Sequence, residues 1–171
     1  MIEIRQEEPK DYGAVYNVVK AAFESADHAD GNEADLVNAL RKGKSFIPEL
    51  SLVAEEEGDI TGHILFTKAR VGKETVLALA PLSVAPAWQR QGIGTALVRE
   101  GHKRAKALGY DCIVVLGSET YYPRFGYVPA ATFGIHPPFD VPSKNFMVCP
   151  IGNAAPAPRG IMTYAKEFGI E

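Results

Sequence analysis

The stretch Leu79–Leu108 constrains the fold most, because it joins an apolar segment to a helical one through a glycine-containing turn. The apolar segment, Val76–Val84, predicts a buried strand, although Pro81 inside it cannot donate a hydrogen bond to a neighbouring strand. We therefore expect this strand to be unpaired or bulged on at least one side. After the turn, an amphipathic helix is indicated, and Gly109 is expected to end it in a left-handed conformation. Its predicted apolar face consists of Ile93, Leu97, Gly101, Ala105 and Leu108.

The turn between these two segments, Gln89–Thr95, has the composition of an anion-binding site. The first N–H groups of a helix have no intrahelical partner, and the helix dipole adds partial positive charge at the same end. Gly92 and Gly94 lack a Cβ, so a diphosphate could approach the backbone closely there. A purely structural turn is the alternative, since glycines are common between a strand and a helix. The dinucleotide-binding pattern is excluded because Leu97 occupies the position of its third glycine, and the Gly-Lys-Ser/Thr of a P-loop is absent.

One spacing, Leu82-x-Val84-x-Pro86-x-x-Gln89-x-x-Gly92-x-Gly94, combines the strand end, the proline and the glycine turn. It resembles the acetyl-CoA-binding signature of the GNAT superfamily of N-acetyltransferases. The resemblance implies acetyl-CoA as cosubstrate, with its pantetheine arm along the strand end and its diphosphate at the turn. The cofactor-binding residues implied are Leu82, Ser83, Val84, Gln89, Arg90, Gln91, Gly92, Ile93, Gly94 and Thr95. Arg90, and after it Arg99, is expected near the adenosine 3′-phosphate.

A second resemblance lies in Tyr121-Tyr122-Pro123-Arg124-Phe125-Gly126-Tyr127, which is similar to the family pattern Tyr-x-Lys/Arg-x-Gly-Phe. The register selects Tyr122 as the catalytic residue, the general acid that protonates the departing CoA thiolate in the family. A phenol with an ordinary pKa near 10 is protonated at neutral pH and can serve in this role without tuning. The alternative is a pair of aromatic residues that only pack a short helix.

Two departures from the family pattern leave roles open. Gly117-Ser118 shortens the stretch ahead of the aromatic pair, so Tyr121 could take the place of Tyr122. The glutamate often found on the central strand is missing, because Ala78–Ser83 contains no carboxylate. Deprotonation through water, Glu119 or His63 are the alternatives for the general base, and His63 could equally sit on a sheet face without a catalytic role.

Within the superfamily, the chain resembles the YhbS-like predicted acetyltransferases. The features that it shares with this subgroup are Leu79–Val84, the Gly-Ser pair, the Tyr-Tyr-Pro-Arg-Phe-Gly-Tyr segment, Phe23 and Glu33-x-x-Leu36-Val37-x-x-Leu40. The resemblance covers 2–129 well and the remainder more loosely. It implies an α+β, three-layer fold: a mixed, mostly antiparallel central sheet with a parallel splayed strand pair and helices on both faces.

The local patterns agree with such a fold. Strands are expected at Met1–Arg5, Ser51–Ala54, Ile60–Val71, Cys112–Leu116 and Phe146–Pro150, and helices at Lys10–Phe23 and Asn32–Lys42, the second capped by Asn32. Ala130–Pro142 is expected to be irregular, and Gly160–Phe168 to form a closing amphipathic segment. The parallel strand Cys112–Leu116, diverging from Val76–Val84, would leave a slot for the pantetheine arm, to which Leu82 and Val84 offer backbone groups.

An acidic connection, Asp27–Glu33 followed by Asp35, separates the first two helices. Its spacing does not match a calcium loop, and a single histidine makes no zinc site, so no metal site is predicted. A solvated loop is one interpretation. The other is that this negative loop attracts a cationic amine, because these helices commonly flank the acceptor pocket in the family.

Composition bounds the remaining possibilities. The 171 residues are 46% hydrophobic and predict one domain, 1–171, with a full core. The formal net charge of −3 argues against nucleic acid as a partner, and no apolar run is long enough for a membrane span. Cys112 and Cys149 predict buried reduced thiols, and we expect a cytoplasmic protein that is a monomer or a homodimer.

Together these features predict an acetyl-CoA-dependent N-acetyltransferase that transfers an acetyl group to a small-molecule or protein amine. The amine would attack directly in a ternary complex. The alternative is a non-catalytic acyl-CoA-binding sensor or interaction module, which the missing strand carboxylate favours.

Overall fold

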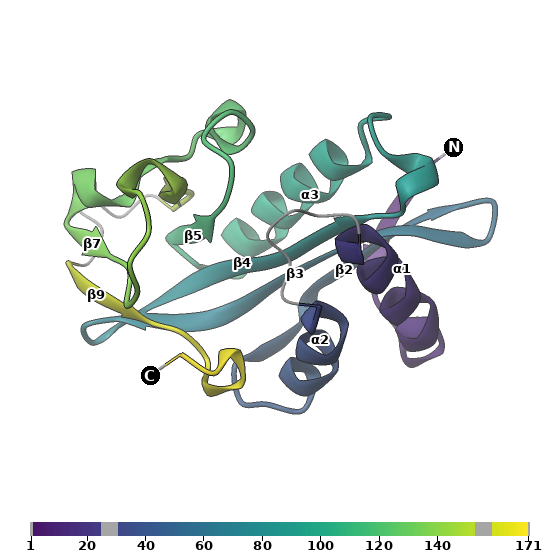
Figure 1. The fold of residues 1–171 in the computed structure, drawn as a ribbon, viewed down its shortest axis with the longest axis horizontal. Helices are drawn as coiled ribbons and strands as arrows, with labels where there is room; N and C mark the ends of the chain where they lie inside the picture. The colour runs from purple at the N-terminus through teal and green to yellow at the C-terminus, as the bar shows by residue number, and fades with distance from the viewer. Residues whose placement is uncertain (1, 25–30, 153–158, 171) are drawn as a thin grey trace.

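The apolar segment before the glycine turn forms β4 (Glu74–Val84), which lies inside a mixed sheet (Figure 1). The computed structural model describes residues 2–24, 31–152 and 159–170. Within them the sheet has the order β1-β2-β3-β4-β5-β8-β6, and β9 pairs with both β3 and β7. The other strands are β1 (Glu3–Gln6), β2 (Phe46–Glu56), β3 (Asp59–Val71), β5 (Cys112–Leu116), β6 (Val128–Pro129), β7 (Ile135–His136), β8 (Phe146–Pro150) and β9 (Gly160–Thr163).

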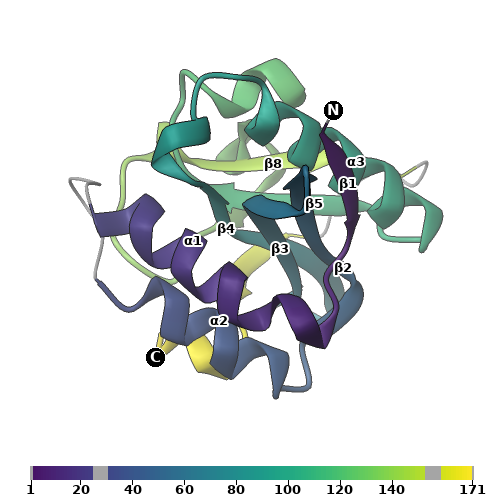
Figure 2. The same ribbon diagram turned by 90° about the vertical axis from the view of Figure 1, so that its right-hand side faces the viewer.

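Helices cover both faces of this sheet, as the figures show from two sides (Figures 1 and 2). α1 (Tyr12–Glu24) and α2 (Glu33–Arg41) pack on one face, and α3 (Ile93–Ala107) packs on the other. The apolar side of each helix packs against the strand residues that face it. The hydrophobic core therefore consists of two layers, one on each face of the sheet. Short 3₁₀ helices lie at Pro9–Asp11, Pro86–Trp88, Tyr122–Phe125, Ala130–Phe133, Ser143–Asn145 and Lys166–Phe168. The predicted three-layer α+β fold is confirmed.

The strand pair β4 and β5 is parallel and splayed. The two strands pair only through Leu77 with Ile113 and Ala78 with Val114. Beyond these positions β4 continues to Val84 without a partner among the described residues on this side. β5 ends at Leu116 and pairs with β8 on its other side along its whole length. The C-terminal part of β4 therefore has an unpaired edge on the β5 side, as the sequence predicts.

Pro81 lies in a bulge on the opposite side of β4. Leu82 pairs with Ile64 of β3 and Leu79 pairs with Phe66, so Ala80 and Pro81 together face one residue. A proline has no N–H to give to a ladder, and a bulge accommodates that loss. The expected irregularity is confirmed on both sides of the strand.

Helix α3 follows the predicted pattern except at its last apolar position. Its buried residues are Ile93, Leu97, Val98, Gly101 and Ala105. Leu108 was expected on the same face, but its side chain is 44% exposed because the helix has already ended there. Gly109 has φ +94°, and Tyr110 N–H donates to the carbonyl of Ala105, which closes the helix as a Schellman motif.

Three further expectations need correction. β2 begins at Phe46 rather than Ser51, because a register shift between those residues takes up Pro48 within the strand. The predicted cap of α2 is wrong as a side-chain cap: Asn32 precedes the helix, but its side chain makes no capping hydrogen bond. The predicted amphipathic segment Gly160–Phe168 is divided between β9 and a 3₁₀ turn.

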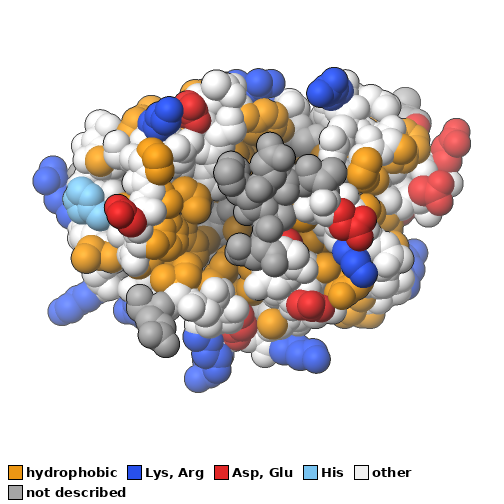
Figure 3. All heavy atoms as spheres, viewed as in Figure 1, with side chains coloured by type: hydrophobic (Ala, Val, Ile, Leu, Met, Phe, Trp, Pro, Cys, Tyr) orange, Lys and Arg blue, Asp and Glu red, His pale blue; other side chains and the backbone are white. Residues whose placement is uncertain are grey.

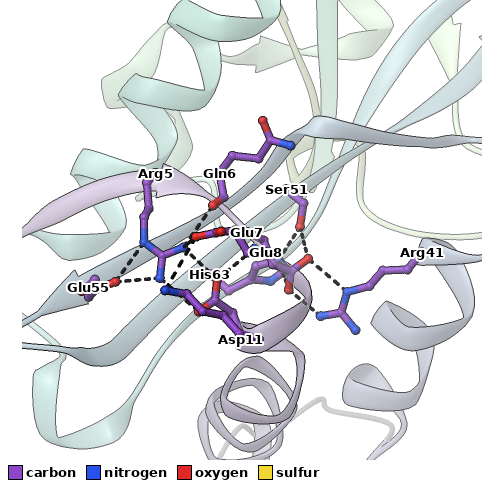
Figure 4. Close-up of polar contacts among 10 residues, drawn as sticks. Arg5, Gln6, Glu7, Glu8, Asp11, Arg41, Ser51, Glu55 and His63 are labelled. Atoms are coloured by element: carbon purple, nitrogen blue, oxygen red, sulfur yellow. Dashed lines mark hydrogen bonds and ion pairs between the residues drawn. The ribbon is translucent and has the colours of Figure 1, made fainter.

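A buried polar cluster ties the N-terminal segment and α2 to the sheet (Figure 4). Arg41 makes two contacts with the Glu7 carboxylate, at 3.0 and 2.5 Å. Ser51 Oγ donates to Glu7 Oε1 at 2.8 Å and therefore accepts from His63 Nε2 at 2.9 Å. His63 is fully buried in its neutral form, because burial lowers its pKa to about 4.

No helix within the described residues is long and apolar enough to span a membrane. Cys112 and Cys149 are both buried and free, as expected.

Candidate active site

The open edge of β4 presents backbone hydrogen-bonding groups to the gap beside β5. Ala85 N–H donates to the carbonyl of Thr61 on the β3 side at 2.8 Å. Because successive residues of a strand point their N–H and C=O groups to opposite sides, those of Val84 and Leu82 point to the open side. The Gln89 side chain donates to the Val84 carbonyl at 3.0 Å, so the glycine turn is tied to the end of the strand.

A cavity of about 430 Å³, the turn cavity, lies at the N-terminus of α3. It is lined by Val84, Trp88, Gln89, Arg90, Gly92, Ile93, Gly94, Thr95, Tyr121 and Arg124. The cavity therefore collects most of the residues that the sequence predicts for the diphosphate. Arg90 and Arg124 are the two cationic side chains in its lining.

The backbone of the glycine turn is shaped for close approach of a ligand. Gly92 precedes the helix with φ +86°, a conformation that favours glycine, and Arg90 also has a positive φ of 65°. No side-chain hydrogen bond caps the start of α3. An added Cβ at Gly94 would lie 2.7 Å from the Tyr121 hydroxyl, so a larger residue here would require the end of the Tyr121 side chain to shift. The first-turn N–H groups of α3 thus face the cavity without a capping side chain.

Two of the predicted cofactor residues do not line a cavity with their side chains. Ser83 is buried on the α1 and α2 side of the sheet, where it pairs with His63. Gln91 is exposed, and its side chain donates back to the Ala87 carbonyl at 3.3 Å. Their contribution to binding remains a prediction that concerns their backbone groups.

A second and larger cavity, the split cavity, occupies about 720 Å³ between α2, the bulge of β4 and the C-terminal segment. It is lined by Phe23, Asn32, Glu33, Asp35, Leu36, Ala39, Leu79, Ala80, Pro81, Leu82, Leu116, Tyr122, Phe139, Tyr164, Glu167, Phe168 and Ile170. Hydrophobic side chains gather over β4, β5 and β9 on the face shown in Figure 3, with acidic side chains beside them. The two cavities are adjacent along β4, because Leu82 lines one and Val84 the other.

The two adjacent tyrosines point to different cavities. Tyr122 lines the split cavity together with the β4 bulge and Leu116, whereas Tyr121 lines the turn cavity. The Tyr122 ring packs directly on the backbone of Gly117, where an added Cβ would approach the ring to 2.4 Å. Its edge contacts with the rings of Tyr121 and Tyr127, at 5.1 and 5.6 Å between centroids, fix its direction. The shortened Gly117-Ser118 stretch thus provides the space in which Tyr122 is seated.

Burial sets the protonation state of Tyr122. Desolvation, with a smaller contribution from Tyr121, raises the pKa of its phenol well above the ordinary value. The hydroxyl is consequently protonated throughout the neutral range and holds a proton that it can donate.

Arg124 lines the turn cavity, although the sequence analysis assigned it no binding role. Its guanidinium lies 4.7 Å from the centre of the Tyr121 ring and donates to the Tyr121 carbonyl at 3.0 Å. Arg99 was expected second to Arg90, but it lies over the Phe125 ring at 5.5 Å and does not line the turn cavity. The family pattern contains a Lys or Arg at the position of Arg124, and that match was the available signal.

Neither named candidate for the general base lines the split cavity. His63 belongs to the buried cluster of Figure 4. Glu119 is exposed, accepts a hydrogen bond from Asn145 at 2.7 Å and lies 3.4 Å from Lys144. Its own backbone N–H and Asn145 lower the pKa of Glu119, which weakens it further as a base.

The acidic connection before α2 is only partly visible. Asp27 and His28 lie outside the described residues, whereas Glu33 and Asp35 line the split cavity. Tyr16 donates a hydrogen bond to Asp35 at 3.0 Å. Among the described residues no group of three or more His, Cys, Asp or Glu side chains could hold a metal ion.

Comparison with known proteins bears on this geometry. The chain is 42% identical over 118 residues to the Escherichia coli protein YjhQ, an uncharacterized N-acetyltransferase, across 66% of this chain and 65% of that protein. It is 35% identical over 131 residues to E. coli YhbS, also an uncharacterized N-acetyltransferase, across 75% and 74% of the two chains.

Solved structures are similar over nearly the whole chain. A GNAT family acetyltransferase from Brucella melitensis, crystallised with acetyl-CoA, has 32% identity and a TM-score of 0.82, covering 98% of both chains. E. coli YhbS, crystallised with CoA, has 28% identity and a TM-score of 0.87, covering 98% of this chain and 92% of that one. The model of the acetyltransferase (GNAT) family matches residues 12–127, which run from α1 to the aromatic segment. The chain therefore belongs to the GNAT family of acetyltransferases.

Proposed function

We propose that this protein is an acetyl-CoA-dependent N-acetyltransferase that transfers an acetyl group to a primary amine by direct attack in a ternary complex. The observation that supports this most is the meeting of two cavities at the open edge of β4. Leu82 and Val84 face one cavity each and lie two residues apart on one strand. A cosubstrate that extends along this edge would place its phosphates in the turn cavity and its acyl end in the split cavity.

The residues present fit a CoA diphosphate at the turn cavity. The first N–H groups of α3, the left-handed turn at Gly92 and the cations Arg90 and Arg124 all favour an anion there. Because Gly94 has no Cβ, this wall of the cavity leaves room for both the ligand and the Tyr121 hydroxyl. We propose that Leu82 and Val84 hold the pantetheine arm through backbone groups, as an added strand would be held.

Bound acetyl-CoA supplies a thioester, whose carbonyl carbon accepts the amine nitrogen while the bond to sulfur breaks. Tyr122 donates its proton to the departing sulfur. Backbone N–H groups at the open edge of β4 stabilise the negative charge that develops on the carbonyl oxygen. Of the three candidates for the base, we propose water for the proton that the attacking amine loses, because Glu119 and His63 do not line the split cavity. Water also returns a proton to Tyr122 after the transfer.

Direct transfer is favoured over a covalent enzyme intermediate. Cys112 and Cys149 do not line either cavity, and burial raises the pKa of each thiol to about 11. A thiol with such a pKa contains little thiolate at neutral pH and is a poor nucleophile. The free thiols also support the cytoplasmic location that forms part of this proposal.

Calorimetric titration with CoA and with pantetheine, which lacks the diphosphate, tests the turn cavity. We expect CoA to bind at least about a hundredfold more tightly, because pantetheine leaves the charge-assisted hydrogen bonds at α3 unmade. Equal affinities would contradict the assignment of the turn cavity.

Thiol release from acetyl-CoA across a panel of amines tests the reaction. The proposal expects release with at least one amine, and an equal amount of acetylated amine. Tight acetyl-CoA binding without release for any amine would instead support the acyl-CoA sensor, which the absence of a carboxylate at Ala78–Ser83 would then explain.

A further inference from the structure

We infer that the acceptor is a primary amine carried on an aromatic or aliphatic body that has no carboxylate. This inference rests on the proposed function, since it assigns the acceptor to the split cavity. It comes from the contrast between the wall of that cavity, which is largely apolar and aromatic, and the charged side chains among its described lining residues, which are all acidic.

The wall is built for an apolar body. Phe139, Tyr164 and Phe168 form a continuous row, with ring centroids 5.8 Å apart for the first pair and 5.2 Å for the second. Each of the three rings is only half-buried. Phe23 and Leu36 line the opposite side, from α1 and α2. Binding a ring or an alkyl chain here removes apolar surface from water on both partners.

The charges select a cation. Asp35 is exposed at the first turn of α2, and Glu33 and Glu167 are half-buried, while the described residues of the lining include no Lys, Arg or His. Asp35 is held in place by the hydrogen bond from Tyr16. An ammonium group approaching the cavity is therefore attracted, and it can lose its proton to water before it attacks the thioester.

The same charges disfavour an amino acid as acceptor. Its α-carboxylate would lie beside the carboxylates of Asp35 and Glu167, with no cation among the described residues of the lining, which costs binding free energy.

The test compares two ligands that differ only by a carboxylate. The CoA-loaded protein is titrated calorimetrically with 2-phenylethylamine and with phenylalanine, and hexylamine follows. We expect 2-phenylethylamine to bind at least about fiftyfold more tightly than phenylalanine, because the site rejects an unpaired buried charge. Hexylamine is expected to bind as well, because its alkyl chain can cover the same apolar wall.

Charge-neutral variants test the acidic residues in the same assay. Asp35→Asn and Glu167→Gln are each expected to weaken 2-phenylethylamine binding about threefold, and together about tenfold, as for partly solvated ion pairs. Acetyl-CoA affinity should not change. Glu100→Gln, which removes a carboxylate paired with Arg104 on α3, is the matched control and should have no effect on either ligand.

The outcomes separate this inference from the proposed function. Phenylalanine binding as tightly as 2-phenylethylamine would overturn the inference, as would unchanged affinity in the double variant. If the amine binds as expected but no thiol is released, the proposed function fails while the acceptor class stands. If another class of amine supports thiol release and 2-phenylethylamine does not bind, the inference fails while the enzyme stands.

Discussion

Replacing Tyr122 with phenylalanine removes one hydroxyl from the split cavity and leaves the ring in place. The ring contacts with Tyr121, Tyr127 and the Gly117 backbone involve carbon atoms that phenylalanine retains. The fold and the turn cavity should therefore be unchanged, so that any loss of rate reports on the hydroxyl alone.

The expected loss is about a hundredfold in kcat, or about 2.7 kcal/mol in the activation barrier. This is the lower end of what a general acid contributes, because a thiolate is a more stable leaving group than an alkoxide or an amide anion. The raised pKa of Tyr122 keeps the parent hydroxyl protonated across the neutral range, so the loss should be the same at pH 7 and pH 8.

The assay is thiol release at saturating acetyl-CoA and amine, with acetyl-CoA affinity measured by calorimetry on the same samples. Acetyl-CoA affinity should stay within about twofold of the parent. Tyr121→Phe is the matched control, because this neighbouring hydroxyl lies over Gly94 in the turn cavity. We expect it to weaken acetyl-CoA binding by about threefold to fivefold and to leave kcat nearly unchanged. Parental turnover in Tyr122→Phe, together with a large loss in Tyr121→Phe, would refute the assignment and transfer the role to Tyr121.

Three further predictions concern stability and the cosubstrate. Because the pKa of His63 falls from 6.5 in the unfolded chain to about 4 in the fold, its contribution to stability is complete above pH 6.5 and is lost as the pH falls towards 4. Between pH 6.5 and pH 4, the free energy of unfolding measured with urea should fall by about 3 kcal/mol more for the parent than for His63→Gln. An equal pH dependence of the unfolding free energy in the two proteins would contradict this prediction. Gly117→Ala pushes a methyl group into the Tyr122 ring and should cost about 1–3 kcal/mol of unfolding free energy and most of the turnover, whereas Gly13→Ala, with open space around it, should stabilise α1 slightly. Arg124→Gln should weaken CoA binding about fivefold at low salt and less at high salt, and a salt-independent effect would argue against a phosphate contact.

Local patterns predicted the fold well where one segment determines its own structure. The proline and the glycines of the β4–α3 unit predicted the bulge and both ends of the helix, because each imposes a backbone restriction that does not depend on distant residues. The open strand edge was predicted from the splayed strand pair that the family resemblance implies. The predicted length of β2 was too short, since a proline such as Pro48 normally interrupts a strand. Only the pairing with β3 shows that a register shift accommodates Pro48 within the strand. Leu108 was misassigned because periodicity alone does not show at which residue the helix stops following the core.

The candidate site also has one part that local sequence predicted and one part that it did not. The turn cavity is built mainly from one continuous segment, and its residues were named from spacing. The split cavity draws on Phe139 and Tyr164, far along the chain, and their meeting with Leu82 depends on how the C-terminal segment crosses the sheet. No local pattern carries that information. The choice between Tyr121 and Tyr122 likewise needed the position of Gly117 relative to the ring.

Mass spectrometry of the amine panel after incubation with acetyl-CoA tests the central claim most directly. The proposal predicts that at least one amine gains an acetyl group, in an amount equal to the thiol released, and that Tyr122→Phe slows both about a hundredfold. Tight binding of acetyl-CoA, with no acetylated amine from any member of the panel, would contradict it.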